Sequence, residues 1–136
     1  MSLLNVILQE TNFPNIYFAG RRNIVELPTY IHQFDVCVNP QLINIVTMGN
    51  YPLTIDEYLA MGKPTVATKT KAMEIFNGYT YLAEGPEDYP ALISRALEEN
   101  NPQMEITRRE FALTHTWENS ITELYKAIYK TNKNLF

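Results

Sequence analysis

The residues between Gly49 and Ala67 combine a turn, a helix entrance, an acidic side chain one turn into the helix and a glycine at its end. The first N–H groups of a helix have no partner within it, and the helix dipole makes that end positive. Proteins that bind phosphorylated ligands often place such an entrance at the carboxyl edge of a parallel sheet. The entrance at 50–53 is therefore a candidate phosphate site, with Asn50 able to cap or turn and Pro52 suited to the first turn. An ordinary helix start has the same features.

Glu57 is the side chain of this segment best suited to chemistry, and two roles are open for it. The spacing Thr54-Ile55-Asp56-Glu57 is that of a capping box, in which Glu57 would only accept a hydrogen bond from the backbone at the helix start. Alternatively, its carboxylate could accept hydrogen bonds from a ligand, with the added strength of a charged acceptor. The pattern alone does not choose between the two roles.

Short β-branched runs alternate along the chain with segments of helical period, and these elements must position the site. Strands are expected at 16–19, 35–39, 65–68 and 80–83, and helices at 3–9, 26–33, 53–61, 71–76, 86–99, 105–114 and 118–130. Strands that alternate with helices predict an α/β fold, with a parallel sheet covered by helices on both faces. The last two helices are expected to close the C-terminal end. Helical spacing predicts that most tyrosines and Trp117 face the core.

Composition excludes several classes of function. The 136 residues fit a single domain and carry a net charge of −4, which argues against nucleic-acid binding by general electrostatics. Cys37 has no second cysteine to pair with, no stretch could span a bilayer and no signal peptide is visible, so a cytoplasmic location is expected. His32 and His115 lack partners at metal-ligand spacing, so no metal is expected and both are interpreted as structural or surface residues.

The segment 49–67 resembles the donor-nucleotide segment of retaining, group 1 glycosyltransferases of the GT-B fold. The family pattern is roughly NP-x-K-x-x-E-[YA]-[LM]-A-x-G-[KT]-P-V-V-A. The matching residues are Asn50, Pro52, Glu57, Tyr58, Leu59, Ala60, Gly62, Lys63, Pro64, Val66 and Ala67. The upstream text NIYFAG…ELPTYIHQFDVCVNP also resembles the family, and the similarity extends from about Asn15 to Tyr129.

This resemblance implies a Rossmann-like sheet, the C-terminal domain of a GT-B enzyme, and assigns roles to particular residues. Glu57 would hold the ribose hydroxyls of a nucleotide sugar, and the helix entrance would face the diphosphate. No cofactor is implied beyond the nucleotide-sugar donor, no metal is implied, and no catalytic residue can be assigned. The implied nucleotide-sugar-binding residues are Glu57, Gly49, Asn50, Tyr51, Pro52, Leu53, Thr54, Arg21 and Arg22.

The sequence departs from the family at two positions, one near the implied donor sugar and one near the implied diphosphate. Many members carry a second glutamate eight residues before the first, where Gly49 stands here. In the most similar subgroup, Asn44 and Thr47 match the loop pattern, but Thr54 stands where lysine is usual. The lost positive charge could be replaced from loops that follow expected strands, although such residues are more often solvated loop charges. The candidates are Arg21, Arg22, Lys69 and Lys71.

A complete GT-B enzyme has two domains, and this sequence resembles only the donor-binding one. The expectation is that residues 1–136 are one domain of a glycosyltransferase that lacks the N-terminal acceptor domain. Its parent would transfer a sugar from a nucleotide sugar to a glycan or lipid-linked saccharide, and would alone provide any membrane association. The alternative is a non-catalytic binding or partner module. Open sheet edges at Ile16 and Val36 favour a homodimer, or else direct pairing of those two edges within a monomer.

Overall fold

A parallel three-stranded sheet forms the centre of the computed structural model, which describes residues 13–133. Its strands lie side by side in the order β1-β2-β3, with Val38 opposite Val66 and Ala67 opposite Leu82. The helix expected at 3–9 lies outside the described residues. The strands are β1 (Cys37–Asn39), β2 (Thr65–Thr68) and β3 (Tyr81–Ala83).

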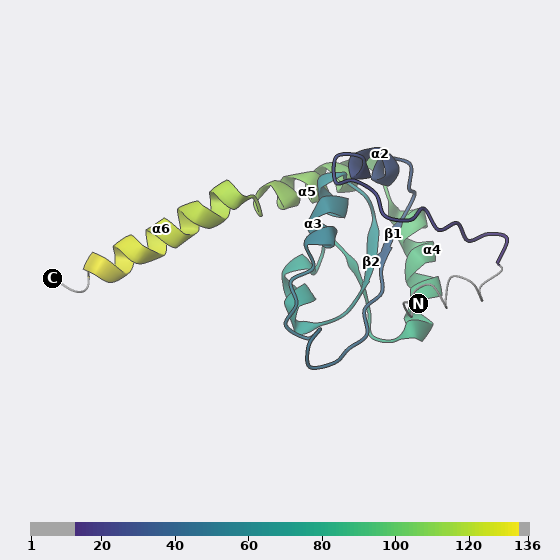
Figure 1. The fold of residues 1–136 in the computed structure, drawn as a ribbon, viewed down its shortest axis with the longest axis horizontal. Helices are drawn as coiled ribbons and strands as arrows, with labels where there is room; N and C mark the ends of the chain where they lie inside the picture. Colours follow the sequence, from purple (N-terminus) through teal and green to yellow (C-terminus); the bar gives the residue numbers. More distant parts are fainter. Residues whose placement is uncertain (1–12, 134–136) are drawn as a thin grey trace.

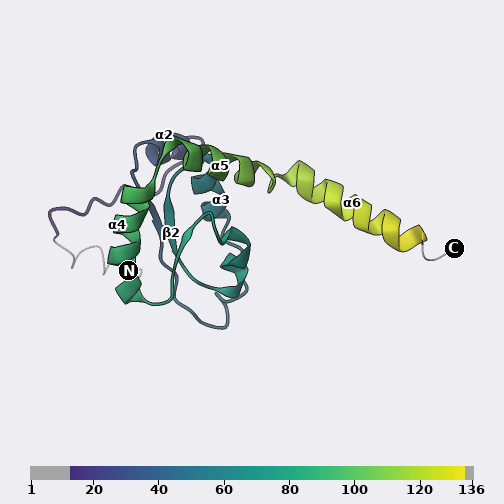
Figure 2. The same cartoon turned by 180° about the vertical axis from the view of Figure 1, so that it is seen from behind.

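Helices cover both faces of the sheet, as the sequence predicts. In Figures 1 and 2, α3 and α4 lie on opposite sides of the strands, and α5 lies beside α3. The predicted α/β architecture and its parallel sheet are confirmed. The helices are α2 (Leu27–His32), α3 (Leu53–Ala60), the 3-10 helices η1 (Lys71–Phe76) and η2 (Pro86–Asp88), α4 (Tyr89–Glu99), α5 (Pro102–Leu113) and α6 (Trp117–Lys133).

The hydrophobic core lies between β2, α3, η1 and α5. All four residues of β2 are buried, because this strand is the middle one and is covered on both faces. Phe76 at the end of η1 is fully buried, and the rings of Tyr51 and Phe111 pack against it. The core residues are Ile55, Leu59, Ala67, Met73, Phe76 and Ala112.

Two arginines of α5 fix the C-terminal end of α3. The buried Arg108 donates from Nη1 to the Gly62 carbonyl at 3.1 Å, and Arg109 donates from Nη2 to the Met61 carbonyl at 3.4 Å. Gly62 has φ +74°, and a Cβ there would come within 2.9 Å of Arg109 Nε. Positive charge at the negative end of a helix is stabilising. These two contacts hold the C-terminal end of α3 in place. They therefore help to position the entrance at its N-terminal end.

The strand expected at 16–19 does not form, so that prediction was wrong. The segment is irregular, and the side chains of Ile16, Tyr17 and Phe18 are exposed. An extended segment becomes a strand only when a neighbour accepts and donates its backbone hydrogen bonds. In residues 13–133 the outer edge of β1 has no strand beside it. The two edges therefore do not pair with each other inside the described monomer.

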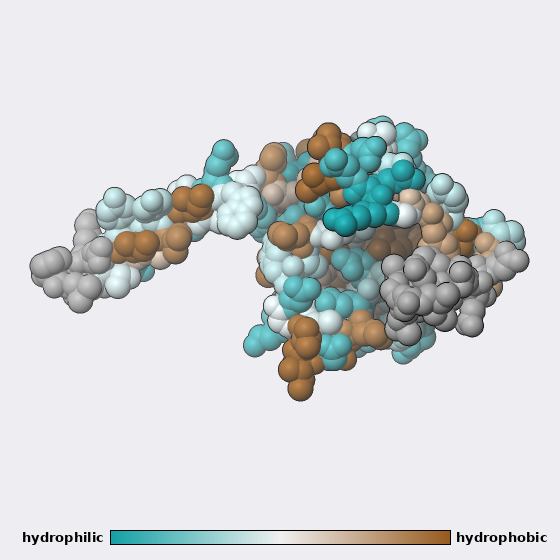
Figure 3. Space-filling model, in the orientation of Figure 1, coloured by the Kyte–Doolittle hydropathy of each residue, from teal (hydrophilic) through white to brown (hydrophobic). Residues whose placement is uncertain are grey.

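The last helix does not close the domain, contrary to expectation. α6 projects from the body of the molecule (Figures 1 and 2), and Figure 3 shows apolar side chains along its length. Trp117, Tyr125 and Tyr129 are exposed, so the prediction that they face the core was wrong. The helical period fixes which residues share a face, but it does not show that another element covers that face.

Candidate functional site

The entrance of α3 offers fewer free N–H groups than a bare helix start. Pro52 precedes the first helical residue and no side chain caps the helix. The Leu53 N–H donates to the Tyr51 carbonyl at 3.1 Å, and the Ile55 N–H donates to the Pro52 carbonyl at 2.9 Å. Between them, the Thr54 N–H makes no hydrogen bond to any described residue. The Thr54 amide, at the positive end of the helix, is thus available to an anion.

Glu57 is not a capping residue in this structure. Thr54, the first residue of the supposed capping box, lies inside α3 rather than before it. Within residues 13–133, neither the Thr54 hydroxyl nor the Glu57 carboxylate makes a hydrogen bond or an ion pair. The capping-box interpretation is therefore wrong. Glu57 is half-buried on α3, with its carboxylate available to an outside donor.

The loop before α3 is folded by its own side chains. Asn44 Oδ1 accepts hydrogen bonds from the N–H groups of Val46 at 2.9 Å and Thr47 at 3.0 Å, and Thr47 Oγ1 accepts from the Asn44 N–H at 2.9 Å. These bonds give Asn44 and Thr47 a local structural role. Gly49 and Asn50 follow as exposed residues, and the Asn50 N–H donates to the Thr47 carbonyl at 3.2 Å. Asn50 does not cap α3.

Tyr51 is held against the core beside the helix entrance. Its hydroxyl donates to Asp56 Oδ2 at 2.5 Å, and the other oxygen of Asp56 lies 2.8 Å from His115 Nδ1. Burial, the hydrogen bond to Asp56 and the charge of Asp56 raise the pKa of the Tyr51 phenol above its ordinary value, which already lies well above neutral pH. A groove of about 430 Å³ lies beside this network. Its lining includes Tyr51, Leu53, Asp56, Ile75, His115 and Trp117.

The sequence contains no local signal for this network. His115 has no metal-ligand spacing around it, and Asp56 is only an intervening residue of the apparent capping box. The two residues are separated by 59 positions, so only the packing of α5 against α3 brings them together. The sequence shows an acidic residue in the first turn of α3, but it does not show the partners of that residue.

The structure does not bring Arg22 to the entrance of α3. Its guanidinium lies over the ring of Tyr30 in α2, at 5.1 Å from the ring centroid. The end of α2 is fixed near the amino end of β2, because Lys63 Nζ donates to the His32 carbonyl at 2.9 Å. The entrance of α3 instead follows the carboxyl end of β1. Arg21 is an exposed residue of the same irregular segment as Arg22.

The two lysines after β2 also differ in what they could contribute. Lys69 Nζ forms an ion pair with Glu84 Oε1 at 2.6 Å, which joins the carboxyl ends of β2 and β3. The hydrogen bond to Glu84 raises the pKa of Lys69, so its charge is already balanced there. Lys71 begins η1 and is exposed, without an ion pair in the described part of the chain.

A second groove, of about 460 Å³, lies at the carboxyl ends of the strands. Thr68 at the end of β2 organises its floor: Oγ1 accepts from the Gln41 N–H at 2.8 Å and lies 2.7 Å from the Tyr89 hydroxyl. Ligands of open α/β sheets bind at this edge. Sequence reasoning missed these three residues, because each resembles an ordinary loop or core residue.

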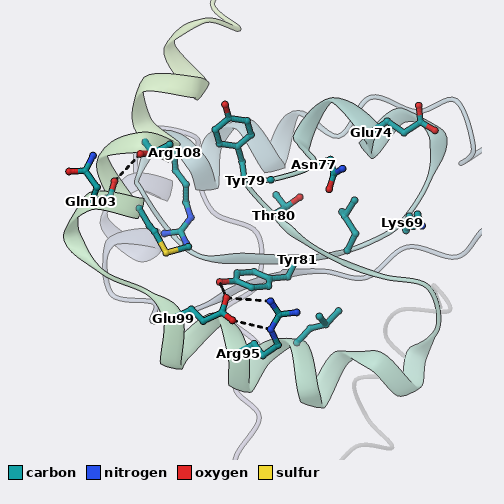
Figure 4. Close-up of a pocket in the computed structure, with 15 residues that line it drawn as sticks. Lys69, Glu74, Asn77, Tyr79, Thr80, Tyr81, Arg95, Glu99, Gln103 and Arg108 are labelled. Atoms are coloured by element: carbon teal, nitrogen blue, oxygen red, sulfur yellow. Dashed lines mark hydrogen bonds and ion pairs between the residues drawn. The ribbon is translucent and has the colours of Figure 1, made fainter.

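The largest of these three cavities, about 590 Å³, lies on the β3 side of the molecule (Figure 4). Figure 4 shows Glu99 bound to both Tyr81 and Arg95: the Tyr81 hydroxyl donates at 2.9 Å and Arg95 Nε at 3.1 Å. Lys69 lines this cavity, but the other three candidate cations, Arg21, Arg22 and Lys71, do not. Glu57 lines none of the three cavities.

The described residues contain neither a cluster of metal-binding side chains nor a reactive thiol. Among residues 13–133, no group of His, Cys, Asp and Glu side chains is placed to hold a metal ion. Burial raises the pKa of the Cys37 thiol to about 11, which makes it a poor nucleophile at neutral pH. No helix in this range is long and apolar enough to cross a membrane.

Comparison with known proteins identifies the family. The family described as "Glycosyl transferases group 1" matches residues 3–99. The chain is also 29% identical over 109 residues to a Bacillus subtilis (strain 168) protein named "Putative teichuronic acid biosynthesis glycosyltransferase TuaH". That alignment covers 76% of this chain but 28% of the relative. No solved structure matches the chain. With its parallel α/β fold and a family match over most of its length, this chain belongs to the group 1 glycosyltransferases of the GT-B fold.

Proposed function

We propose that this chain is the donor-binding part of a retaining glycosyltransferase that uses a nucleoside diphosphate sugar. The carboxylate of Glu57 is the observation that carries the proposal, because it is half-buried and has no partner within residues 13–133. It stands one turn from the Thr54 N–H, which is also without a partner in that range. A hydroxyl-binding carboxylate beside an anion-binding helix entrance suits a ribose joined to a diphosphate.

The proposed acceptor is a glycan or a lipid-linked saccharide, and the sugar transferred is a hexose. The name of the Bacillus subtilis relative, which refers to teichuronic acid biosynthesis, supports a role in making polysaccharides. The chain spans 28% of that relative, and in this proposal a second, N-terminal domain holds the acceptor. The proposal places the parent enzyme in the cytoplasm, where the single cysteine of this chain would remain reduced.

A non-catalytic partner module is the second candidate. It is favoured by Gly49 and Thr54, which stand where the family usually has glutamate and lysine. The structure adds that Arg22 lies over Tyr30 and that Lys69 forms an exposed ion pair with Glu84, which leaves Lys71 as the candidate after β2 without an ion pair in the described residues. A module of this kind would keep the fold but bind the diphosphate weakly.

Replacing Glu57 by glutamine tests the proposed function. If Glu57 accepts hydrogen bonds from the ribose, Glu57→Gln should weaken nucleotide-sugar binding by about 1.5 to 3 kcal/mol, the range for a hydrogen bond to a charged group. The melting temperature should not change, because Glu57 caps no backbone group. Calorimetric titration with UDP-, GDP-, ADP- and CDP-sugars measures the affinity. Glu110→Gln, at an exposed position of α5, is the control. Equal affinity in wild type and Glu57→Gln would rule out the ribose contact.

The open edge of β1 leads to a proposal about assembly. Cys37 N–H donates to the Pro64 carbonyl beside β2, so the backbone groups of the next residue, Val38, point to the outer edge. That edge, together with the exposed Ile16 and Phe18, can pair with a second copy of the chain. We expect a homodimer by light scattering at about 100 μM, and a monomer for Val38→Pro, which removes the outward N–H. A wild-type monomer at that concentration would contradict the proposal.

A further inference from the structure

Asp56 connects the entrance of α3 to the turn that precedes α6. One carboxylate oxygen accepts from the Tyr51 hydroxyl at 2.5 Å, and the other lies 2.8 Å from His115 Nδ1. The side chains of Asp56 and His115 are only 18% and 21% exposed. A single carboxylate is therefore shared between the loop before α3 and the segment between α5 and α6, two regions far apart in the sequence.

The rings of both partners rest on one buried side chain. Tyr51 and His115 lie 5.7 Å and 5.9 Å from the Phe76 ring centroid, and Phe111 packs edge-on against His115 at 4.4 Å. Because Phe76 is fully buried, it gives both rings a fixed surface to pack against, and a shift of either ring away from it would lose that contact. The network thus fixes Tyr51 through its hydroxyl and through its ring.

Tyr51 in turn determines the backbone at the helix entrance. Its carbonyl accepts from the Leu53 N–H at 3.1 Å, and the unpartnered Thr54 N–H follows directly. A displacement of Tyr51 would therefore change the direction of the Thr54 N–H. Asp56 also lies in the first turn of α3, where its charge would repel a bound diphosphate. The two hydrogen bonds it accepts offset that repulsion.

We propose that Asp56 and His115 are positioning residues for the diphosphate end of the donor, acting through Tyr51. They hold the entrance of α3 in the geometry that binds the diphosphate and make that geometry depend on the α5–α6 turn. This inference rests on the proposed function, and it adds two residues to the site. Neither needs to contact the ligand.

Two single substitutions and one matched control test the inference. Tyr51→Phe and His115→Phe each remove a hydrogen bond to Asp56 and keep an aromatic ring on Phe76. Tyr81→Phe is the control, because its hydroxyl also donates to a carboxylate, Glu99 Oε2 at 2.9 Å, in the cavity of Figure 4. Calorimetry measures the affinity of each variant for a nucleoside and for its diphosphate. The nucleoside is whichever of uridine, guanosine, adenosine and cytidine has the diphosphate that binds wild type most tightly.

The diphosphate should bind both test variants about 5- to 20-fold more weakly. This is less than the factor of about 10 to 150 for direct loss of a hydrogen bond to a charged group, because the ligand contact is displaced rather than removed. The nucleoside affinity, and both affinities of Tyr81→Phe, should stay within about twofold of wild type. Because both bonds act through one carboxylate, the double variant should lose little more than the weaker-binding single variant. Equal losses for nucleoside and diphosphate, or an unchanged His115→Phe, would overturn the inference.

Failure of the proposed function would look different. If wild type binds none of the four diphosphates, the donor-binding proposal is wrong, and the network is then judged by amide hydrogen exchange at residues 51–55. Faster exchange in His115→Phe than in wild type and Tyr81→Phe would support the positioning of the entrance by His115. Equal exchange in all three proteins would overturn it.

Discussion

The 136 residues as an isolated protein are expected to transfer no sugar from any nucleotide sugar to any acceptor. Holding donor and acceptor at reacting distance can account for about 7 to 11 kcal/mol of a reaction barrier. A donor-binding domain alone cannot supply that positioning, because in a two-domain enzyme the other domain holds the acceptor. Departure of the diphosphate also requires nearby positive charge. The first two turns of α3 instead carry Asp56 and Glu57, and of the two lysines after β2 Lys69 is paired with Glu84, so Lys71 alone of that pair is without an ion pair in the described residues.

A radiolabelled-donor assay with a range of glycan acceptors measures this directly. The Glu57→Gln variant supplies the background rate, because it keeps the fold and loses the proposed donor contact. Adding a separately produced N-terminal domain from the parent protein should restore transfer. Turnover by the isolated wild-type chain above the Glu57→Gln rate would show that the 136 residues contain a complete active site.

Phe76→Ala should destabilise the domain more than truncation of any other side chain in the core cluster. Among residues 13–133, Phe76 is the largest fully buried side chain, and its ring lies 5.7 Å from Tyr51 and 6.1 Å from Phe111. Truncating a buried phenylalanine removes its transfer free energy and leaves a cavity, which costs about 3 to 5 kcal/mol. Urea unfolding followed by circular dichroism measures the change in the free energy of unfolding.

Phe13→Ala provides the matched comparison. The same chemical change at Phe13, which is 57% exposed, should alter the free energy of unfolding by less than about 1 kcal/mol. Nucleotide affinity should also fall in Phe76→Ala, because Tyr51 would lose its support. Similar losses of stability in the two variants would show that Phe76 is not the centre of the core.

The central layers of the fold could be predicted from the sequence because their signals are local. The run 65–68 is short, β-branched and bounded by Pro64, and it forms β2 with the expected bounds. The helical period from Leu53 and the stop at Gly62 give α3, whose C-terminal end requires the positive φ that glycine adopts readily. In each case, neighbouring residues contain the information that determines the element.

The wrong predictions concern elements that depend on a distant partner. The run 16–19 has strand composition, but no described strand lies beside it to complete its hydrogen bonds. The apolar stripe of α6 indicates a helix correctly, yet whether a stripe is covered depends on what else is present. Composition and period describe what a segment can form. The neighbours decide whether it does.

The candidate site shows the same division. The entrance at 50–53 and Glu57 could be located from one continuous stretch of sequence. The capping box is a wrong interpretation, because the helix begins at Leu53 and therefore places Thr54 inside it. The pairing of Asp56 with His115 and that of Lys69 with Glu84 are tertiary, and no spacing rule connects their positions. Which charges are free and which are balanced is decided only by the folded chain.

Because α6 projects from the body of the molecule, its stability depends mainly on its own sequence rather than on packing against the core. Its 17 residues only slightly exceed the length of about 12 to 15 residues below which an isolated helix is marginally stable in water even when rich in alanine. Asn119, Ser120 and Thr122 are weak helix formers, and the Glu123–Lys126 pair at 2.7 Å is exposed and adds little. We therefore expect this helix to exchange with coil independently of the core. Trypsin should cut after Lys126 and Lys130 long before it reaches any peptide bond of the sheet.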